Sequence, residues 1–221
     1  MNTLVEYAPI LWDGFLKTLL VAAGAGVVML VTSFAFGVAG VSRSGWLRWP
    51  IRVMVEFLRG TSAYVQLFWA YFALPLFGIY IDAIIVGIIV LGLNVGSYGS
   101  EVVRGAILSV PRDQTEGAVA LNLSRFQSMR YVILPQALVS MIPPMGNLAI
   151  DLLKITPLVS LITIADLTFQ AQVVRQQTND TILIYGFVLV VYFILSSAVA
   201  HVFTKAGAHF SRGIDIQRGG R

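Results

Sequence analysis

Long uncharged stretches alternate with short charged segments along the chain. Four of these stretches, residues 18–42, 60–81, 83–100 and 181–204, contain no Asp, Glu, Lys or Arg. Because about 20 helical residues cross a hydrocarbon core of about 30 Å, each stretch is predicted to be a membrane-spanning helix.

The apolar region of residues 131–165 is less regular. It contains the prolines Pro135, Pro143, Pro144 and Pro157. Proline removes a backbone donor, so we expect breaks in the helix, and Asp151 and Lys154 add charge. We predict one irregular crossing over 139–158, followed by a re-entrant or interfacial segment at 162–171.

The composition supports a fold built in lipid, since 57% of the residues are hydrophobic and 12% are charged. We therefore predict an all-α, polytopic membrane helix bundle with about five transmembrane helices. One domain spans residues 14–205, between an outer N-terminal segment (1–13) and a basic cytoplasmic tail (206–221). The N-terminus lacks the basic cluster of a secretory signal, so the first stretch is expected to be mature structure.

Basic residues gather in the connections after the first and third crossings and in the C-terminal tail, whereas Asp82, Asp166 and Asp180 fall in the opposite connections. The positive-inside rule then places the N-terminus outside and the C-terminus in the cytoplasm. We expect a multi-pass protein of the bacterial inner membrane. The net charge of +4 is explained by this bias and does not indicate nucleic-acid binding.

The small-residue motifs Ala22-x-x-x-Gly26, Ala35-x-x-x-Ala39 and Gly92-x-x-x-Gly96 favour close helix contacts. Packing within one bundle and a dimer interface are both compatible with them.

A long polar connection, residues 104–130, separates the third and fourth crossings and is predicted to form two short helices. Asp113 and Glu116 have the spacing of a capping box that opens the first helix. Asn122 is expected to end it, because asparagine readily adopts the left-handed conformation.

A second capping box, Ser124 to Gln127, is predicted to open another helix, which ends where Pro135 turns the chain back to the membrane. Apolar residues surround the turn between the helices: Ala118, Leu121, Leu123, Phe126 and Met129. They fit either a plug for a groove in a partner protein or an amphipathic hairpin lying in the lipid interface.

The segments Glu116-Gly117-Ala118, Asn122 and Val132-Ile133-Leu134-Pro135 resemble, with its spacing, the E-A-A, G, I-x-L-P signature of permeases of ATP-binding-cassette (ABC) importers. The likeness to the polar amino-acid branch, including the ectoine-type permeases, extends over residues 14–205. Gly117, Asn122 and Val132 depart from the usual alanine, glycine and isoleucine of the signature.

This resemblance implies that the hairpin, residues 113–135, is a coupling element that docks on an ATPase subunit. The residues it assigns to ATPase coupling are Glu116, Gly117, Ala118, Asn122, Val132, Leu134 and Pro135. It further implies a complex with a second permease subunit, identical or different, two cassette ATPases and an extracytoplasmic solute-binding protein.

The chain lacks a G-x-x-x-x-G-K-[ST] phosphate loop, so ATP and Mg²⁺ are expected in the partner ATPase, with no cofactor on this chain. It contains no cysteine and two histidines, and we expect no catalytic and no metal site. The cargo implied is a polar amino acid or a related zwitterion such as ectoine. An ATP-independent secondary transporter or channel subunit is the alternative, because hydropathy does not reveal the energy source.

Acid and base recur three residues apart at Glu56/Arg59, Glu101/Arg104 and Asp151/Lys154. This spacing places both partners on one helix face. The first two pairs lie near predicted helix ends and are expected to be structural. Asp151 and Lys154 lie deeper, and they fit either a solute pathway or a buried salt bridge.

Overall fold

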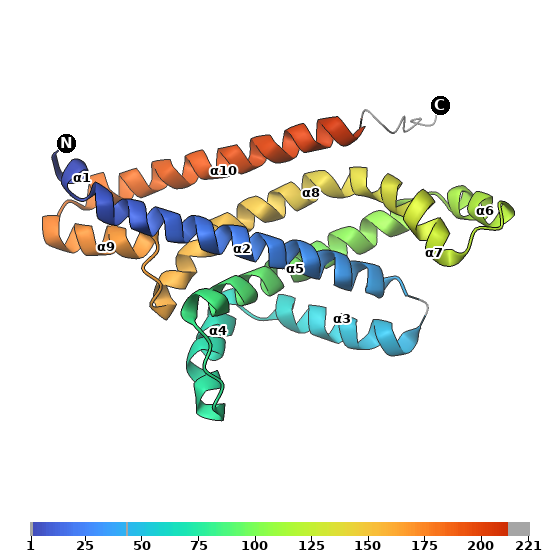
Figure 1. The fold of residues 1–221 in the computed structure, drawn as a ribbon, viewed down its shortest axis with the longest axis horizontal. Coiled ribbons are helices and arrows are strands. Elements are labelled where there is room, and N and C mark those ends of the chain that lie inside the picture. The colour runs from blue at the N-terminus through green and yellow to red at the C-terminus, as the bar shows by residue number, and fades with distance from the viewer. Residues whose placement is uncertain (1, 43, 212–221) are drawn as a thin grey trace.

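A computed structural model describes residues 2–42 and 44–211, and within these ranges the ordered elements are helices (Figure 1). The α-helices are α1 (Asn2–Glu6), α2 (Ala8–Gly40), α3 (Gly45–Gly60), α4 (Ala63–Phe68), α5 (Ala83–Ser109), α6 (Arg112–Ala120), α7 (Arg125–Gln127), α8 (Leu134–Ile155), α9 (Leu167–Thr178) and α10 (Thr181–Ser211). The π-helical segments η1 (Trp69–Ala73) and η3 (Ser128–Ile133) and the 3-10 segments η2 (Leu74–Phe77) and η4 (Thr156–Ile162) continue some of them. The predicted all-α class is confirmed.

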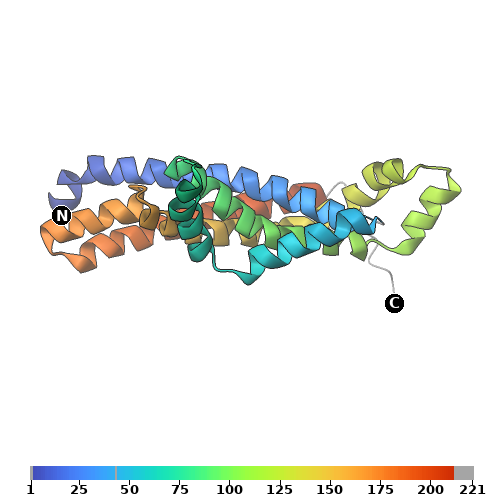
Figure 2. The same ribbon diagram turned by 90° about the horizontal axis from the view of Figure 1, so that it is seen from below.

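The long helices α2, α5, α8 and α10 run along one common direction and form an elongated bundle (Figures 1 and 2). The short helices α6 and α7 project from one end of this bundle, which we call the hairpin end. Helix α9 and the N-terminus lie at the other end, which we call the α9 end. The bundle therefore separates its two candidate membrane faces by the length of its long helices.

Helices α2 and α5 run parallel in close contact, which follows from glycines on their shared face. A Cβ atom added at Gly92 would lie 2.5 Å from the Val28 Cβ atom, and one at Gly96 would lie 2.7 Å from the Thr32 Cβ atom. The Gly92-x-x-x-Gly96 motif thus packs within the bundle, whereas nothing lies within 4 Å of a Cβ at Gly26. Glycine permits this approach because its backbone has no side chain to displace.

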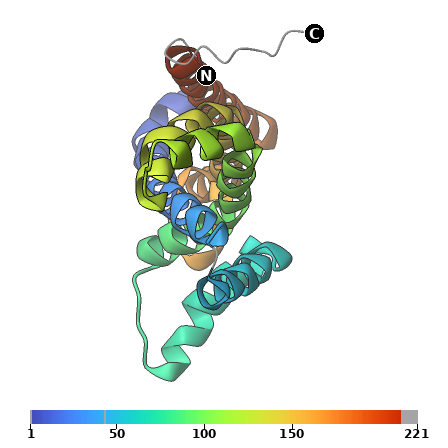
Figure 3. The ribbon, with the colours of Figure 1, turned by 90° about the vertical axis from the view of Figure 1, so that its right-hand side faces the viewer.

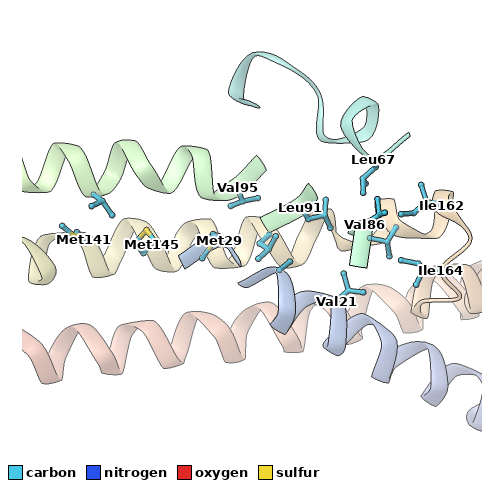
Figure 4. Packing of buried hydrophobic residues seen from close by; sticks show 14 of the residues in the cluster. Val21, Met29, Leu67, Val86, Leu91, Val95, Met141, Met145, Ile162 and Ile164 are labelled. Carbon is cyan, nitrogen blue, oxygen red and sulfur yellow. The ribbon is translucent and has the colours of Figure 1, made fainter. Parts of the chain in front are cut away.

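The core lies where α2, α4, α5, α8 and η4 meet, and it is filled by branched and sulfur-containing side chains (Figure 4). Its buried members include Val21, Met29, Leu67, Val86, Leu91, Val95, Met141, Met145, Ile162 and Ile164. Met29, Met141 and Met145 lie together between α2, α5 and α8, where unbranched side chains can fill the irregular space between helices.

Four segments are long and apolar enough to span a membrane: Ala8–Gly40, Ala83–Ser109, Arg125–Ile162 and Thr181–Ala208. They contain the third, fourth and fifth predicted crossings, and all but the last two residues of the first. The second predicted crossing, 60–81, is not one long helix. Its helical part, Ala63–Phe77, is shorter than a full span and leaves the bundle at an angle (Figures 1 and 3).

The break in this second crossing lies between α3 and α4, where Thr61 and Ser62 have extended backbones. Helix α3 comes before this break and packs against α2 and α5. It contains Pro50 and charged residues, so the prediction from uncharged runs did not include it. The chain therefore returns from the hairpin end by two consecutive helices, and counting uncharged residues found only the second.

The expected breaks at Pro143 and Pro144 are wrong, because both residues lie inside α8. Neighbouring helices α5 and α10 pack against α8, and such packing lets a membrane helix continue through proline. Pro157 does mark the change from α8 to the 3-10 segment η4.

The segment predicted to be re-entrant or interfacial at 162–171 contains the end of η4 and the first part of α9. The Leu167 amide donates to the Thr18 hydroxyl at 3.1 Å, which ties the start of α9 to α2. The predicted outer segment 1–13 contains α1 and the first turn of α2. Helix α10 continues to Ser211, through the first residues of the predicted tail, and residues 212–221 of that tail lie outside the described residues.

Candidate functional site

The hairpin at the end of the bundle begins with α6, whose N-cap is Pro111. The predicted capping box of Asp113 and Glu116 is therefore wrong, because Asp113 already lies within the first turn and no side chain caps this helix. The fixed backbone of Pro111 starts the helix two residues earlier than the acidic pattern indicated. In the first turn, the negative charge of Asp113 interacts favourably with the positive end of the helix dipole, although its side chain does not cap the helix.

The turn of the hairpin is rigid because two local hydrogen bonds close α6. Asn122 has a φ of 57°, in the left-handed region, as the sequence predicted. Its amide donates to the Val119 carbonyl at 2.8 Å, and the Leu123 amide donates to the Ala118 carbonyl at 3.0 Å. This pair of bonds is a Schellman motif, which satisfies the last carbonyls of a helix.

The helix after the turn opens with the predicted capping box, which is confirmed. The Ser124 amide donates to Gln127 Oε1 at 2.9 Å, and the Gln127 amide donates to Ser124 Oγ at 3.3 Å. The expected end at Pro135 is wrong, since α7, η3 and α8 form one continuous helical path. Pro135 lies in the first turn of α8, after the π-helical η3, where a missing amide donor is tolerated.

Three large apolar side chains are exposed around the turn of the hairpin, among charged and polar residues. Val119, Leu121 and Phe126 are 68%, 76% and 71% exposed, and we call these three residues the knob. Of the apolar residues that the sequence assigned to this surface, Ala118 is instead buried, and Leu123 and Met129 are half-buried. Val119 was missed, because the spacing around the turn was the only guide to which side faces outward.

The signature residues occupy two different environments. Glu116, Gly117 and Asn122 are exposed, and nothing lies within 4 Å of a Cβ added at Gly117. Val132, Leu134 and Pro135 are half-buried where η3 meets α8. The first group can therefore touch a partner, and the second supports the hairpin from below.

A polar stripe runs along α8. Asp151 and Lys154 are both exposed, and within the described residues they form no ion pair with each other or with another group. The exposed side chains of Asn147 and Ser140 extend the same stripe toward the hairpin end. Ser140, Asn147 and Lys154 follow one another at intervals of seven residues, which places them on one helix face. The prediction did not include Ser140 and Asn147 because it considered charged residues.

Of the two other predicted acid–base pairs, one forms an ion pair in the structure and one does not. Arg104 donates to Glu101 with a shortest distance of 2.6 Å, so this pair is confirmed. Glu56 and Arg59 do not form an ion pair; the Arg59 guanidinium instead lies over the Tyr98 ring, 5.0 Å from its centroid.

Asp166, between η4 and α9, is completely buried, which the sequence did not indicate. Its Oδ1 atom accepts from the Phe169 amide at 2.9 Å and caps α9, while its Oδ2 atom has no hydrogen-bond partner among the described residues. Burial raises the pKa of this carboxyl from 3.8 to about 6, although the backbone hydrogen bonds oppose the shift. In the described part of the chain, no group of three or more His, Cys, Asp or Glu could hold a metal ion.

A bundle of apolar helices with a rigid, apolar-tipped hairpin at one end and a polar stripe along one helix is the architecture of a membrane transport subunit. Residues 29–209 match the family described as "Binding-protein-dependent transport system inner membrane component". The chain belongs to this family of ABC importer permeases, which confirms the resemblance stated for its loop signature.

Similar proteins include one named "Probable amino-acid ABC transporter permease protein y4tF" from Sinorhizobium fredii, 45% identical over 74% of this chain and 71% of the relative. The glutamine transport system permease protein GlnP of Escherichia coli is 35% identical over 89% of this chain and 91% of its own length. A structure described as "Crystal structure of an amino acid ABC transporter with histidines" superposes with a TM-score of 0.83 at 30% identity, covering 96% of this chain and 98% of the other.

Proposed function

We propose that this chain carries a polar amino acid, or a related zwitterion such as ectoine, across the inner membrane as one half of an ATP-driven importer. The observation that carries the proposal is the knob, three large apolar side chains exposed at the tip of a rigid hairpin. Such side chains favour a groove on a partner, because exposure to water is unfavourable.

The proposed partner at the knob is a cassette ATPase, which binds ATP and Mg²⁺. The hairpin suits this role because α6 is fixed at both sides. Its turn is closed by the Schellman motif, and its Gln114 Oε1 atom accepts from Gln136 Nε2 of α8 at 3.1 Å. A movement imposed on the knob is thereby passed to α8, the helix that carries the polar stripe.

The proposed complex contains two permease subunits, two ATPases and an extracytoplasmic solute-binding protein. The knob lies on the cytoplasmic side in this arrangement, and the N-terminus lies outside. Docking of the binding protein is assigned to the α9 end, because it is the end opposite the knob (Figure 1).

The polar stripe is proposed to line the solute pathway. Charged side chains such as Asp151 and Lys154 are costly against hydrocarbon, so this face of α8 requires cover by water or by the second permease subunit. The two groups lie one helical turn apart on one face. Since they do not neutralise each other, the carboxylate can bind a solute ammonium and the ammonium a solute carboxylate.

The names of the similar proteins bear on the choice between an amino acid and ectoine as the cargo. The relatives named above are amino-acid permeases, which favours an amino acid. Both cargoes carry one positive and one negative group, so the same stripe accommodates either.

The test is uptake by vesicles that contain the whole complex. Asn122→Pro imposes a negative φ and removes the amide that bonds to Val119, so it should abolish ATP-driven uptake while the subunit still inserts. Asn122→Gly is the matched control, because glycine adopts a φ of 57° freely, and it should retain uptake. Wild-type uptake by Asn122→Pro, or uptake without any ATPase, would refute the importer assignment and favour a secondary transporter or channel.

A further inference from the structure

An arginine-rich crevice lies at the hairpin end of the bundle, between the last turns of α2, the first half of α3 and the last half of α5. Its lining includes Arg48 and Arg52 from α3, Glu101 and Arg104 from α5, and Gly40 from α2. A Cβ added at Gly40 would lie 3.4 Å from the Arg104 Cδ atom, so the arginine side chain rests directly on the α2 backbone.

The charges of this crevice do not balance. Glu101 is the single carboxylate that lines it. It already accepts hydrogen bonds from two nitrogen atoms of the Arg104 guanidinium, Nε at 3.0 Å and an Nη atom at 2.6 Å. Arg48 and Arg52 are exposed and form no ion pair in the described part of the chain. Two guanidinium groups are thus available to an external anion.

Helix α3 holds these groups in a fixed register. Arg48, Arg52 and Arg59 lie on one stripe of the helix, because they are separated by four and seven residues. Arg59 is occupied by the Tyr98 ring, and its neighbour Glu56 is exposed and forms no ion pair with any residue that the structure describes. Even with Glu56 counted, the four arginines exceed the two carboxylates of this region.

Trp49 lies three residues before Arg52, so an exposed aromatic surface of α3 adjoins the arginines and indicates that the crevice opens to lipid. Trp46 and Trp49 in its first turns are 94% and 71% exposed, and Phe57 continues this apolar face at 61%. Tryptophan is enriched where a membrane protein meets the headgroup region. Arginines beside such residues, in a crevice between helices, suit a lipid phosphate.

We propose that the crevice of Arg48, Arg52 and Arg104 is a binding site for the headgroup of an anionic phospholipid. The phosphate lies between the Arg48 and Arg52 guanidiniums, Arg104 borders it, and the acyl chains follow the apolar face that begins at Trp49. A lipid headgroup held at the mouth of the crevice joins α3 to α5 through Arg104, and so steadies the broken second crossing.

Native mass spectrometry of the purified full-length protein, with phosphatidylglycerol and phosphatidylethanolamine added at equal amounts, tests this site. Wild type should retain phosphatidylglycerol preferentially. Arg48→Gln/Arg52→Gln should lose this retention by about tenfold, whereas Arg48→Lys/Arg52→Lys should keep most of it. Arg112→Gln/Arg125→Gln removes the same charge from exposed hairpin positions and should bind as wild type does.

Equal retention by the Arg48→Gln/Arg52→Gln variant, or equal loss in the hairpin control, would overturn the proposal. Inorganic phosphate distinguishes the two sources of a phosphate group. If millimolar phosphate displaces phosphatidylglycerol from wild type, the ligand is a soluble anion and the lipid assignment is wrong. Each readout is independent of transport, so the lipid site and the importer function can fail separately.

Discussion

Gln136 of α8 donates to Gln114 of α6 through an Nε2–Oε1 hydrogen bond of 3.1 Å. The same Nε2 atom also donates to the Val132 carbonyl at 2.9 Å, so the Gln136 side chain is held in place before it reaches α6. This link joins the hairpin to the helix that carries the polar stripe.

Gln114→Ala removes the link without disturbing the bond between Gln136 and Val132. We expect the ATPase to remain bound, because the knob is intact, and the solute transported per ATP hydrolysed to fall severalfold. Parallel assays of uptake and phosphate release from reconstituted complex measure this ratio. Ser197→Ala, which removes an exposed polar side chain from the middle of α10, is the control and should not change it. An unchanged ratio in Gln114→Ala would show that the link carries no coupling.

Gly92→Val should destabilise the subunit, because its Cβ atom would meet Val28 at 2.5 Å and the Ala25 carbonyl oxygen at 2.8 Å. Overpacking of this kind costs about 1–3 kcal/mol. The thermal unfolding midpoint in detergent should fall accordingly. Gly26→Val, in a similar motif but with nothing within 4 Å, should unfold near the wild-type temperature. Similar losses in both variants would contradict close packing at Gly92.

Asp166 makes the stability of the α9 end depend on pH. Its pKa in the folded protein, about 6, lies above the unfolded value of 3.8, so the folded state binds the proton more tightly. This contribution is complete below about pH 4 and is lost as the pH rises through 6. Its size is about 3 kcal/mol, at about 1.4 kcal/mol per pKa unit.

Unfolding of wild type and Asp166→Asn between pH 4 and pH 7 measures this effect. Asparagine keeps an oxygen that can accept from Phe169 but does not titrate, so the variant should lose this part of the pH dependence. Identical pH profiles for the two proteins would show that Asp166 titrates normally.

Lys154→Met should change which solutes are carried, since it removes one of the two charges proposed to bind a zwitterion. We expect uptake of zwitterionic solutes to fall at least tenfold while the protein folds normally, because the exposed side chain has no ion-pair partner in the described residues. Lys205→Met, an exposed position on α10, is the control. Loss of folding with unchanged selectivity would indicate a structural role.

The sequence predicted those features of the fold that depend on local pattern. Long uncharged runs predicted three of the four spans, and the left-handed Asn122 and the Ser124 capping box follow from side-chain chemistry within a few residues. The continuity of α8 through Pro143 and Pro144 could not be read locally, because packing by other helices sustains it.

The candidate site was predicted in part for the same reason. The hairpin is local in sequence, so the left-handed Asn122 and the Ser124 capping box were predicted correctly, whereas the capping role of Asp113 and the exposure of Ala118 were not. The sequence did not predict that Val119 belongs to the knob or that Asp166 is buried. Whether a side chain is exposed or buried depends on how segments distant in the sequence pack together. One contact between such segments is the bond from the Leu167 amide to Thr18, across most of the chain.

The most direct test of the account uses the absence of native cysteine. Leu121→Cys places one thiol on the knob, and Phe77→Cys places one at an exposed position on the far side of the second crossing. We predict that a membrane-impermeant maleimide labels Cys at 121 only from the cytoplasmic side, and that bound ATPase protects it. The thiol at 77 should react from the outside, with or without ATPase. Labelling of position 121 from the outside, or equal labelling with and without ATPase, would contradict the docking of this hairpin on a cytoplasmic ATPase.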